Sequence, residues 1–266
     1  MDHIAPIFGP SLNGPQSKYP HHSCAMPRVF LNRSVQIRPK SWRDMVQGIF
    51  PQVLSTIVYG ILWILFRSLS RLFLRYRTDG AEHIPRRGGV LFAANHASYA
   101  DIPLLGCGVP RRVFYVGRAN LFPNSVVSWI IRSLGWIPIR PERWDRKAFQ
   151  YVVDMLNAGK AVVIFPEGAR SPDGNLQPGK PGIGMIVAEA QCPVIPVYLD
   201  GTFRVLPMGA FWLRPYPVAV RFGKPVDFRH DLERYQGKEL YKHISQTVMD
   251  RIADLKRVGQ SEEPAL

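Results

Sequence analysis

Cysteine is scarce in this sequence, and its placement excludes a small disulfide or zinc module. The 266 residues contain three cysteines, Cys24, Cys107 and Cys192, none of which lies in a C-x-x-C pair. The histidines are scattered as well, and no H-E-x-x-H or comparable spacing of metal ligands occurs. We therefore expect a protein of a reducing compartment that holds no metal.

Acidic residues are also few. The 20 Asp and Glu stand against 34 Lys and Arg, which leaves a net charge of +14 and a pI near 10.0. A hydrophobic content of 46% is ordinary for a globular protein, and the length suits one large domain. The charge indicates an anionic partner, namely nucleic acid, a phosphate-bearing small molecule or an acidic lipid surface.

Residues 1–44 lack a hydrophobic period, and no acidic residue lies between Asp2 and Asp44. No apolar segment of the kind found in secretory signals follows the start. We expect a disordered basic tail over residues 1–44. An organelle transit peptide, or a translation start at Met26 or Met45, is the alternative for this segment.

Residues 45–66 contain no charge. As one helix they would extend about 33 Å, against a bilayer core of about 30 Å, although Pro51 interrupts the run. Basic residues then recur at every fourth position: Arg67, Arg71 and Arg75. This arrangement predicts a membrane-associated helical segment over residues 45–77, lying in or dipping into an anionic surface. A full span and a buried core helix with a solvated arginine stripe are the alternatives.

From residue 78 onward, short apolar runs alternate with helical patterns. The runs predict buried strands at 89–94, 113–116, 161–165, 194–199 and 218–222. The helical patterns cover 124–134, 144–157, 182–190 and 240–255. We expect an α/β domain over residues 78–258, a largely parallel or mixed sheet flanked by helices, followed by a tail at 259–266. Ligands of such sheets bind at the carboxyl ends of the strands.

The strand at 89–94 runs directly into a cluster of polar residues: Asn95, His96, Ser98 and Asp101. A histidine beside a carboxylate is the pairing used for proton abstraction. Residues five apart do not face each other on a regular helix, so the pairing needs His96 in a turn and Asp101 in the first helical turn. A capping box formed by Ser98 and Asp101 is the structural alternative.

The strand at 161–165 likewise ends in Pro166, Glu167, Gly168 and Arg170. Glycine permits close approach of the backbone to a ligand, and arginine offers a planar fork to a phosphate. Glu167 would repel a phosphate, so we expect it to orient Arg170 or another group. A surface turn with an Arg–Glu ion pair is the alternative.

Two more arginines follow apolar runs, Arg118 after 113–116 and Arg140 after 135–139. Each could be a solvated surface residue. Together with Arg170 they would surround a base with guanidinium groups. This combination suits removal of a proton from a hydroxyl of a phosphorylated substrate.

These motifs resemble, in order, the four blocks of the lysophospholipid (1-acylglycerol-3-phosphate) acyltransferase family. N-H-A-S-Y-A-D is similar to the N-H-x-x-x-x-D block, G-W-I-P-I-R to the second and F-P-E-G-A-R-S to the third. V-I-P-V-Y-L-D-G is similar to the fourth, an apolar strand that contains proline. The resemblance extends from about residue 80 to 226. It departs from the pattern at Ala169, where the family usually has threonine, and this puts the head-group preference in question.

The resemblance implies an acyl-CoA or acyl-carrier-protein donor, lysophosphatidic acid as acceptor and phosphatidic acid as product. His96 would deprotonate the acceptor hydroxyl and Asp101 would hold the imidazole, with no acyl-enzyme, metal or cofactor. Asn95 and backbone N–H groups of the turn would support the oxyanion. The expected substrate-binding residues are Asn95, Ser98, Arg118, Arg140, Glu167, Gly168 and Arg170, with Lys180 as a looser candidate.

Other functions remain as alternatives. Another lyso-lipid acceptor fits the same motifs, as does a catalytically silent membrane tether. A serine hydrolase that uses Ser98 is disfavoured because no G-x-S-x-G elbow exists. We expect no nucleic-acid partner, because the recognition signatures of such modules are missing. The expected location is a membrane, at the cytoplasmic face of the inner or plasma membrane.

Overall fold

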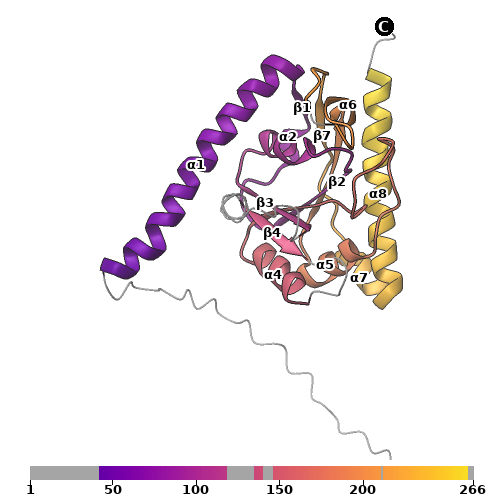
Figure 1. Ribbon diagram of the computed structural model, residues 1–266. Helices are drawn as coiled ribbons and strands as arrows, with labels where there is room; N and C mark the ends of the chain where they lie inside the picture. Colours follow the sequence, from indigo (N-terminus) through magenta and orange to yellow (C-terminus); the bar gives the residue numbers. More distant parts are fainter. Residues whose placement is uncertain (1–41, 119–134, 140–145, 211, 263–266) are drawn as a thin grey trace, which may run out of the picture.

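The computed structural model describes residues 42–118, 135–139, 146–210 and 212–262 (Figure 1). Residues 1–41 of the tail expected at 1–44 lie outside these residues, and so do the expected helix at 124–134 and Arg140.

A seven-stranded sheet forms the centre of the domain, in the order β1-β7-β6-β2-β5-β3-β4. The strands are β1 (Arg77–Asp79), β2 (Val90–Ala94), β3 (Val113–Arg118), β4 (Trp136–Ile139), β5 (Ala161–Ile164), β6 (Val194–Asp200) and β7 (Ala219–Phe222). All neighbours pair in parallel except β6 and β7, which are antiparallel. The mixed α/β fold predicted from the alternating pattern is therefore confirmed.

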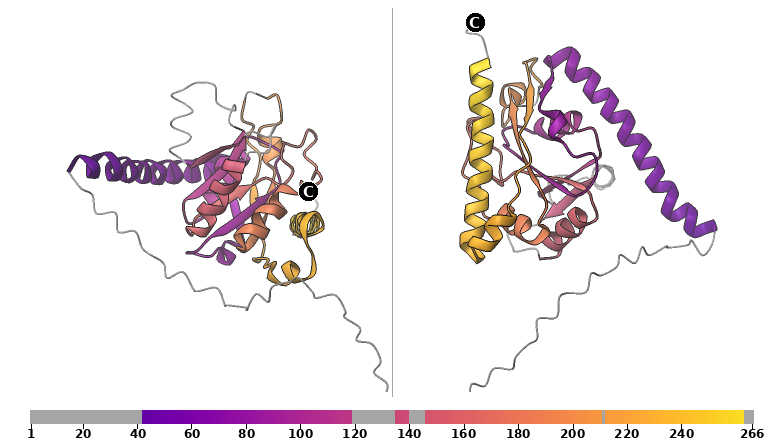
Figure 2. Two further views of the ribbon diagram at one scale, coloured as in Figure 1. Left: turned by 90° about the horizontal axis from the view of Figure 1, so that it is seen from below. Right: turned by 180° about the vertical axis from the view of Figure 1, so that it is seen from behind.

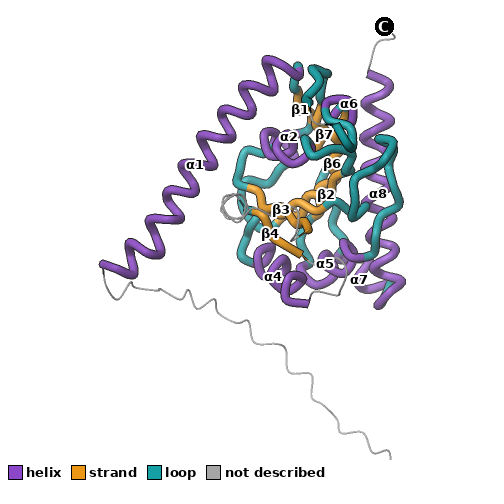
Figure 3. The backbone as a smooth tube through the Cα atoms, viewed as in Figure 1, coloured by secondary structure: helices purple, strands orange, loops and turns teal. Residues whose placement is uncertain are grey.

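Helices cover both faces of the sheet (Figure 3). They are α1 (Trp42–Leu74), the 3₁₀ turn η1 (Ala81–His83), α2 (Asp101–Gly108), α4 (Arg146–Asn157), α5 (Gly182–Ala190), α6 (Thr202–Val205), α7 (Arg229–Arg234) and α8 (Gly237–Glu262). Helices α1 and α8 lie on opposite sides of the domain in all views (Figures 1 and 2).

Strand β2 separates two hydrophobic cores because its side chains alternate between the faces. Phe92 packs with α2 in one core, and Leu91 packs with α5 and α8 in the other. All five residues of β2 are buried, as expected for a central parallel strand with helices on both sides. The segment that follows β2 is thus held by the best-buried strand of the sheet.

Helix α1 touches the domain through a few polar contacts. The indole N–H of Trp63 donates to the carbonyl of Gly106 at 2.9 Å, and Arg67 donates to the carbonyl of Cys107. Thr56–Leu74 is long and apolar enough to cross a membrane, and only 6% of that stretch is buried in the domain. The stretch Thr56–Leu74 is therefore not a buried core helix, although Leu74 at its end packs against the domain.

Several element boundaries differ from the prediction. Helix α1 begins at Trp42 rather than 45, and α8 continues to Glu262, past the expected domain end at 258. Gly259 of α8 lies so close to the buried Arg221 that a Cβ there would be 2.5 Å from the guanidinium. The missed strand β1 is short and polar, and it forms because β7 offers it a free edge.

Candidate active site

The two motif segments meet at one edge of the sheet. Strands β2 and β5 are parallel neighbours, with Ala93 opposite Ile164, so the residues after each strand emerge side by side. The carboxyl edge of a parallel sheet is the usual position of a ligand site. The turn at 95–101 and the loop at 165–180 therefore form one site.

His96 and Asp101 are paired as the spacing required. Nδ1 of His96 lies 2.7 Å from Oδ2 of Asp101, which is fully buried in the first turn of α2. The same oxygen accepts the backbone N–H groups of Ala97 at 2.7 Å and Ser98 at 2.8 Å. Asp101 therefore shapes the turn and contacts the imidazole at once. The capping box of the alternative interpretation is not formed, because the N-cap of α2 is Ala100 and no side chain caps this helix.

The imidazole ring is fixed on one side and open at one edge. Its plane stacks on Phe165, with the ring centres 4.0 Å apart, and 14% of the side chain is exposed. The N–H of Ser171 donates to the His96 carbonyl at 2.7 Å, which ties the loop after β5 to the turn. Within the described part of the chain, Nε2 has no hydrogen-bond partner. In the tautomer whose Nδ1–H donates to Asp101, the lone pair of the imidazole lies on Nε2.

Glu167 holds the backbone on which His96 sits. Its Oε1 accepts the N–H of His96 at 3.0 Å, and its Oε2 accepts the N–H of Gln177 at 3.3 Å. The group that Glu167 orients is thus the turn that carries His96, and the Arg–Glu ion pair of the alternative interpretation is not formed. Burial raises the pKa of the Glu167 carboxyl to about 7, and the two backbone N–H donors oppose this rise only in part.

Cationic side chains surround this turn. The guanidinium of Arg170 lies over the ring of Tyr99, 3.6 Å from its centre. Gly168 has φ +71°, and a Cβ there would lie 2.8 Å from Nζ of Lys180. The structure thus brings Arg170 and Lys180 to the loop beside His96. Tyr99 was not among the predicted site residues. Its position as an aromatic residue between His96 and Asp101 was the only feature that could have indicated it.

The structure does not place the two remaining arginine candidates, Arg118 and Arg140, beside the turn that carries His96. Arg118 is exposed at the end of β3, and β5 separates β3 from β2. Arg140 lies outside the described residues. The geometry therefore places one of the three predicted guanidiniums, that of Arg170, next to the histidine turn.

Asn95 and Ser98 fasten the turn to the fold. The Asn95 amide donates to the Leu199 carbonyl at 3.1 Å and accepts the Leu199 N–H at 2.7 Å. Ser98 Oγ donates to the Leu206 carbonyl at 2.9 Å and accepts the N–H of Ala100 at 3.0 Å. Both side chains are buried. These hydrogen bonds give both side chains a structural role in the turn, and a role of either one in substrate binding stays a prediction.

Three backbone N–H groups of the turn, which was expected to support the oxyanion, have acceptors within the protein. The N–H of His96 donates to Glu167, and those of Ala97 and Ser98 donate to Asp101. These backbone donors are occupied by carboxylates of the protein itself. These three N–H groups are therefore not free to stabilise an oxyanion in this geometry.

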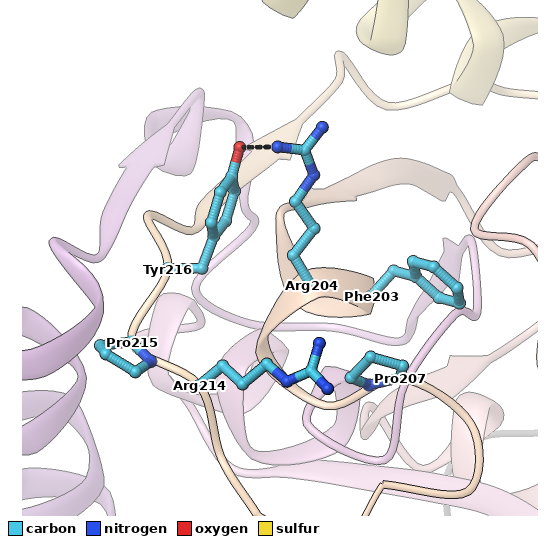
Figure 4. Close-up of a pocket in the computed structure, with 6 residues that line it drawn as sticks. All are labelled: Phe203, Arg204, Pro207, Arg214, Pro215 and Tyr216. Atoms are coloured by element: carbon cyan, nitrogen blue, oxygen red, sulfur yellow. Dashed lines mark hydrogen bonds between the residues drawn. The ribbon is translucent and has the colours of Figure 1, made fainter.

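A cavity of about 400 Å³ opens beside the site, where α6 follows β6 (Figure 4). It is lined by Phe203, Arg204, Pro207, Arg214, Pro215 and Tyr216. Arg204 donates to the hydroxyl of Tyr216 at 2.8 Å. The sequence analysis did not single out these residues, because no motif connects them. Across the described ranges, no group of three or more His, Cys, Asp or Glu residues could hold a metal.

Comparison with known proteins gives a consistent picture. Residues 75–200 match the family model described as Acyltransferase. The chain is 32% identical over 143 residues to a chloroplastic 1-acyl-sn-glycerol-3-phosphate acyltransferase of Brassica napus. The aligned residues make up 51% of this chain and 40% of the relative. The corresponding enzyme of Bacillus subtilis (strain 168) is 23% identical over 66% of this chain and 85% of its own length.

The same similarity appears in three dimensions. The structure resembles that of the 1-acyl-sn-glycerophosphate acyltransferase PlsC from Thermotoga maritima, with a TM-score of 0.64 and 26% identity. That match covers 82% of this chain and 88% of the other. The chain spans less than half the length of the plant relatives from Brassica napus, at 40%, and Arabidopsis thaliana, at 39%.

Proposed function

Residues 75–200 form a domain of the PlsC-like acyltransferase family, and we propose that the chain transfers a fatty acyl group to the free hydroxyl of 1-acyl-sn-glycerol-3-phosphate. The donor is an acyl-CoA or an acyl carrier protein, and the product is phosphatidic acid. The observation that carries this proposal is the His96–Asp101 pair, with a free Nε2, at an edge that also holds Arg170 and Lys180.

The chemistry follows from the state of the imidazole. Nε2 of His96 removes the proton of the acceptor hydroxyl while the oxygen of that hydroxyl attacks the thioester carbonyl. The C–S bond of the tetrahedral intermediate then breaks, and the leaving thiolate takes the proton back from Nε2. Asp101 stabilises the transient imidazolium through Nδ1–H. General-base catalysis of this kind contributes about 10²- to 10⁴-fold to the rate.

The acceptor phosphate binds the cationic side chains of the loop after β5. Arg170 presents a guanidinium whose face is held by Tyr99, so its N–H groups remain free for phosphate oxygens. Lys180 adds a second charge next to Gly168, where the lack of a side chain lets the two segments approach. Arg118 and Arg140 remain proposed contributors to a longer head group or to the donor.

Helix α1 would keep the enzyme at the membrane that holds its substrate. The exposed apolar stretch Thr56–Leu74 continues into Arg75 and Arg77, which suits contact with anionic lipid at a cytoplasmic face. The acceptor itself carries an acyl chain and resides in that membrane. Another lyso-lipid with a phosphate next to a free hydroxyl is the second candidate acceptor, since the same cations would bind it.

Transfer of a labelled acyl group to lysophosphatidic acid in detergent micelles tests this function. Acyl-CoA and acyl carrier protein are supplied in parallel reactions, with the wild type, His96→Ala and the exposed-site control His230→Ala. Product should form with the wild type and with His230→Ala, and turnover should fall about 10²- to 10⁴-fold with His96→Ala.

Two results would oppose the proposal. Equal turnover of His96→Ala and the wild type would remove His96 from the mechanism. A wild type that is silent with both donors, and with every lyso-phospholipid offered, would leave the chain as a membrane tether.

A further inference from the structure

The connection between α6 and β7 exposes apolar side chains that the acyl-transfer mechanism does not use. We define the interfacial loop as residues 206–210 and 212–217. Trp212 is 84% exposed, Leu213 is 68% exposed, and Met208 is also exposed. Single exposed apolar residues are common on soluble proteins, but three within one short loop indicate a surface that meets another phase or partner.

This loop returns to the domain beside the end of α1. The N–H of Val218, the next residue, donates to the Leu74 carbonyl at 2.9 Å, and the N–H of Arg77 donates to the Val218 carbonyl at 3.0 Å. Leu72 and Phe73 of the last turn of α1 are exposed as well. The top of Figure 1 shows α6, β7, β1 and the end of α1 together. The loop therefore returns to the domain at the end of α1 where Leu72 and Phe73 are exposed.

Positive charge accompanies these apolar groups. Arg204 and Arg214 line the cavity next to the loop (Figure 4), and no carboxylate of the described residues forms an ion pair with either of them. The hydroxyl of Tyr216 orients Arg204, and its ring lies beneath that guanidinium, with 4.9 Å from Cζ to the ring centre. Tryptophan and arginine side by side are typical of the head-group level of a membrane.

The loop is also attached to the catalytic turn. The Leu206 carbonyl accepts the hydroxyl of Ser98, which lies between His96 and Asp101 in the sequence. Phe203 of α6 packs closely on Gly174, in the loop that carries Arg170. Contact at the interfacial loop would thus set the distance of the catalytic turn from whatever surface the loop meets.

We propose that the interfacial loop is a second membrane-docking surface, which inserts Trp212 and Leu213 among the head groups of an anionic bilayer while Arg204 and Arg214 bind lipid phosphates. The membrane is favoured over a protein partner because the loop adjoins α1, which already presents a stretch of membrane-spanning length and hydropathy. An acidic carrier protein would complement the charge of Arg204 and Arg214. Binding of such a protein does not explain why the exposed apolar residues of the loop lie next to α1. The proposal concerns membrane contact and does not depend on the acyl-transfer chemistry.

A polarity-sensitive fluorophore tests the contact in the full chain bound to vesicles. The label is attached to the cysteine of Leu213→Cys or, as the control, to that of Val258→Cys on α8. Both variants also carry Cys24→Ser. The native Cys107 and Cys192 are buried and are not expected to react with the label. Vesicles contain phosphatidylcholine alone or mixed with phosphatidylglycerol. With phosphatidylglycerol, emission at 213 should shift to shorter wavelength and be quenched by a lipid-borne quencher, while emission at 258 stays accessible to an aqueous quencher.

Replacement of the arginines tests the role of charge. Arg204→Gln with Arg214→Gln should lower the ratio of lipid-exposed to water-exposed label at 213 in anionic vesicles, by roughly fivefold for each arginine. The matched control, Arg251→Gln with Arg257→Gln, alters exposed arginines of α8 and should leave the ratio unchanged.

Three outcomes would overturn the proposal. The label at 213 could stay water-accessible in both kinds of vesicle. The label could be shielded from water to the same extent in neutral and anionic vesicles, with no change when Arg204 and Arg214 are replaced. This would show that the arginines do not bind lipid phosphate. Shielding only after addition of an acyl carrier protein would make the loop a protein-binding surface instead.

Discussion

The guanidinium carbon of Arg170 lies 3.6 Å from the centre of the Tyr99 ring. Tyr99 belongs to the turn after β2 and Arg170 to the loop after β5, so this contact joins the segment that holds His96 to the loop that is proposed to bind the acceptor phosphate. A stacked arginine keeps its N–H edge free for bidentate hydrogen bonds while one face is covered. Tyr99 is thus a positioning residue for Arg170.

Removal of the aromatic ring should weaken acceptor binding. Tyr99→Leu should raise KM for lysophosphatidic acid by roughly 2- to 5-fold, which corresponds to the strength of an exposed cation–π contact. The value of kcat should stay within about twofold of wild type, because the base is untouched. Tyr99→Phe keeps the ring and should restore KM. Steady-state kinetics would reject the assignment if Tyr99→Phe were as impaired as Tyr99→Leu.

Loss of the guanidinium itself should have a larger effect of the same kind. A charge-assisted hydrogen bond is worth about 1.5–3 kcal/mol, so Arg170→Ala should weaken binding of the phosphate-bearing acceptor roughly 10- to 150-fold. An acceptor that lacks the phosphate, such as a monoacylglycerol, should be bound as it is by the wild type. An equal loss with both acceptors would show that Arg170 acts on the fold and not on the phosphate.

Asp101→Asn separates the charge of this side chain from its hydrogen bonds. The amide oxygen can still accept the N–H groups of Ala97 and Ser98, so the turn should form. A neutral partner no longer stabilises the imidazolium of His96, and turnover should fall by about 10²- to 10⁴-fold. Circular dichroism and Tm should remain close to wild type. Wild-type turnover would mean that the carboxylate only shapes the turn.

The ionisation of Glu167 should appear in the pH dependence of stability. Its pKa is raised to about 7 in the fold, from an ordinary value of 4.5, so the folded protein keeps a proton between these pH values that the unfolded chain has released. The free energy of unfolding should therefore fall as the pH rises from about 5 to about 8, and Glu167→Gln should flatten this slope. Urea denaturation at both pH values measures it.

The control for this experiment is Glu189→Gln, which changes an exposed carboxyl of α5. It should retain the slope of the wild type. A wild type and a Glu167→Gln variant with identical slopes would show that the carboxyl of Glu167 titrates at its ordinary pKa.

Asn95 should matter for stability and not for the chemical step. Asn95→Ala leaves the buried N–H and carbonyl of Leu199 without partners, at about 1–3 kcal/mol for each group, so the free energy of unfolding should drop by about 2–6 kcal/mol. Turnover per folded molecule, measured well below the lowered Tm, should stay near wild type. A selective loss of kcat in a stably folded Asn95→Ala would instead support its predicted role in the site.

Much of the architecture was predictable because buried parallel strands leave a strong signal. The run that forms β2 is apolar and buried at every position. Strands β5, β6 and β7 are mostly apolar and mostly buried, with Arg221 in β7 and the half-buried Asp200 at the end of β6 as exceptions. Strand β1 left no such signal, because its residues Arg, Thr and Asp are polar and their pairing depends only on the edge of β7.

The sequence alone determined which residues could carry out the chemistry. His96, Asp101, Glu167 and Arg170 follow directly after two apolar strands, and a strand end fixes where a side chain emerges. The tertiary structure decided how these residues are used. In the folded chain, Glu167 binds the backbone N–H of His96, and Arg170 stacks on Tyr99. Asn95 and Ser98 form hydrogen bonds inside the fold. The loop that exposes Trp212 returns to the domain beside α1. Such partnerships join residues far apart along the chain, and they form only when parallel strands bring their ends to a common edge.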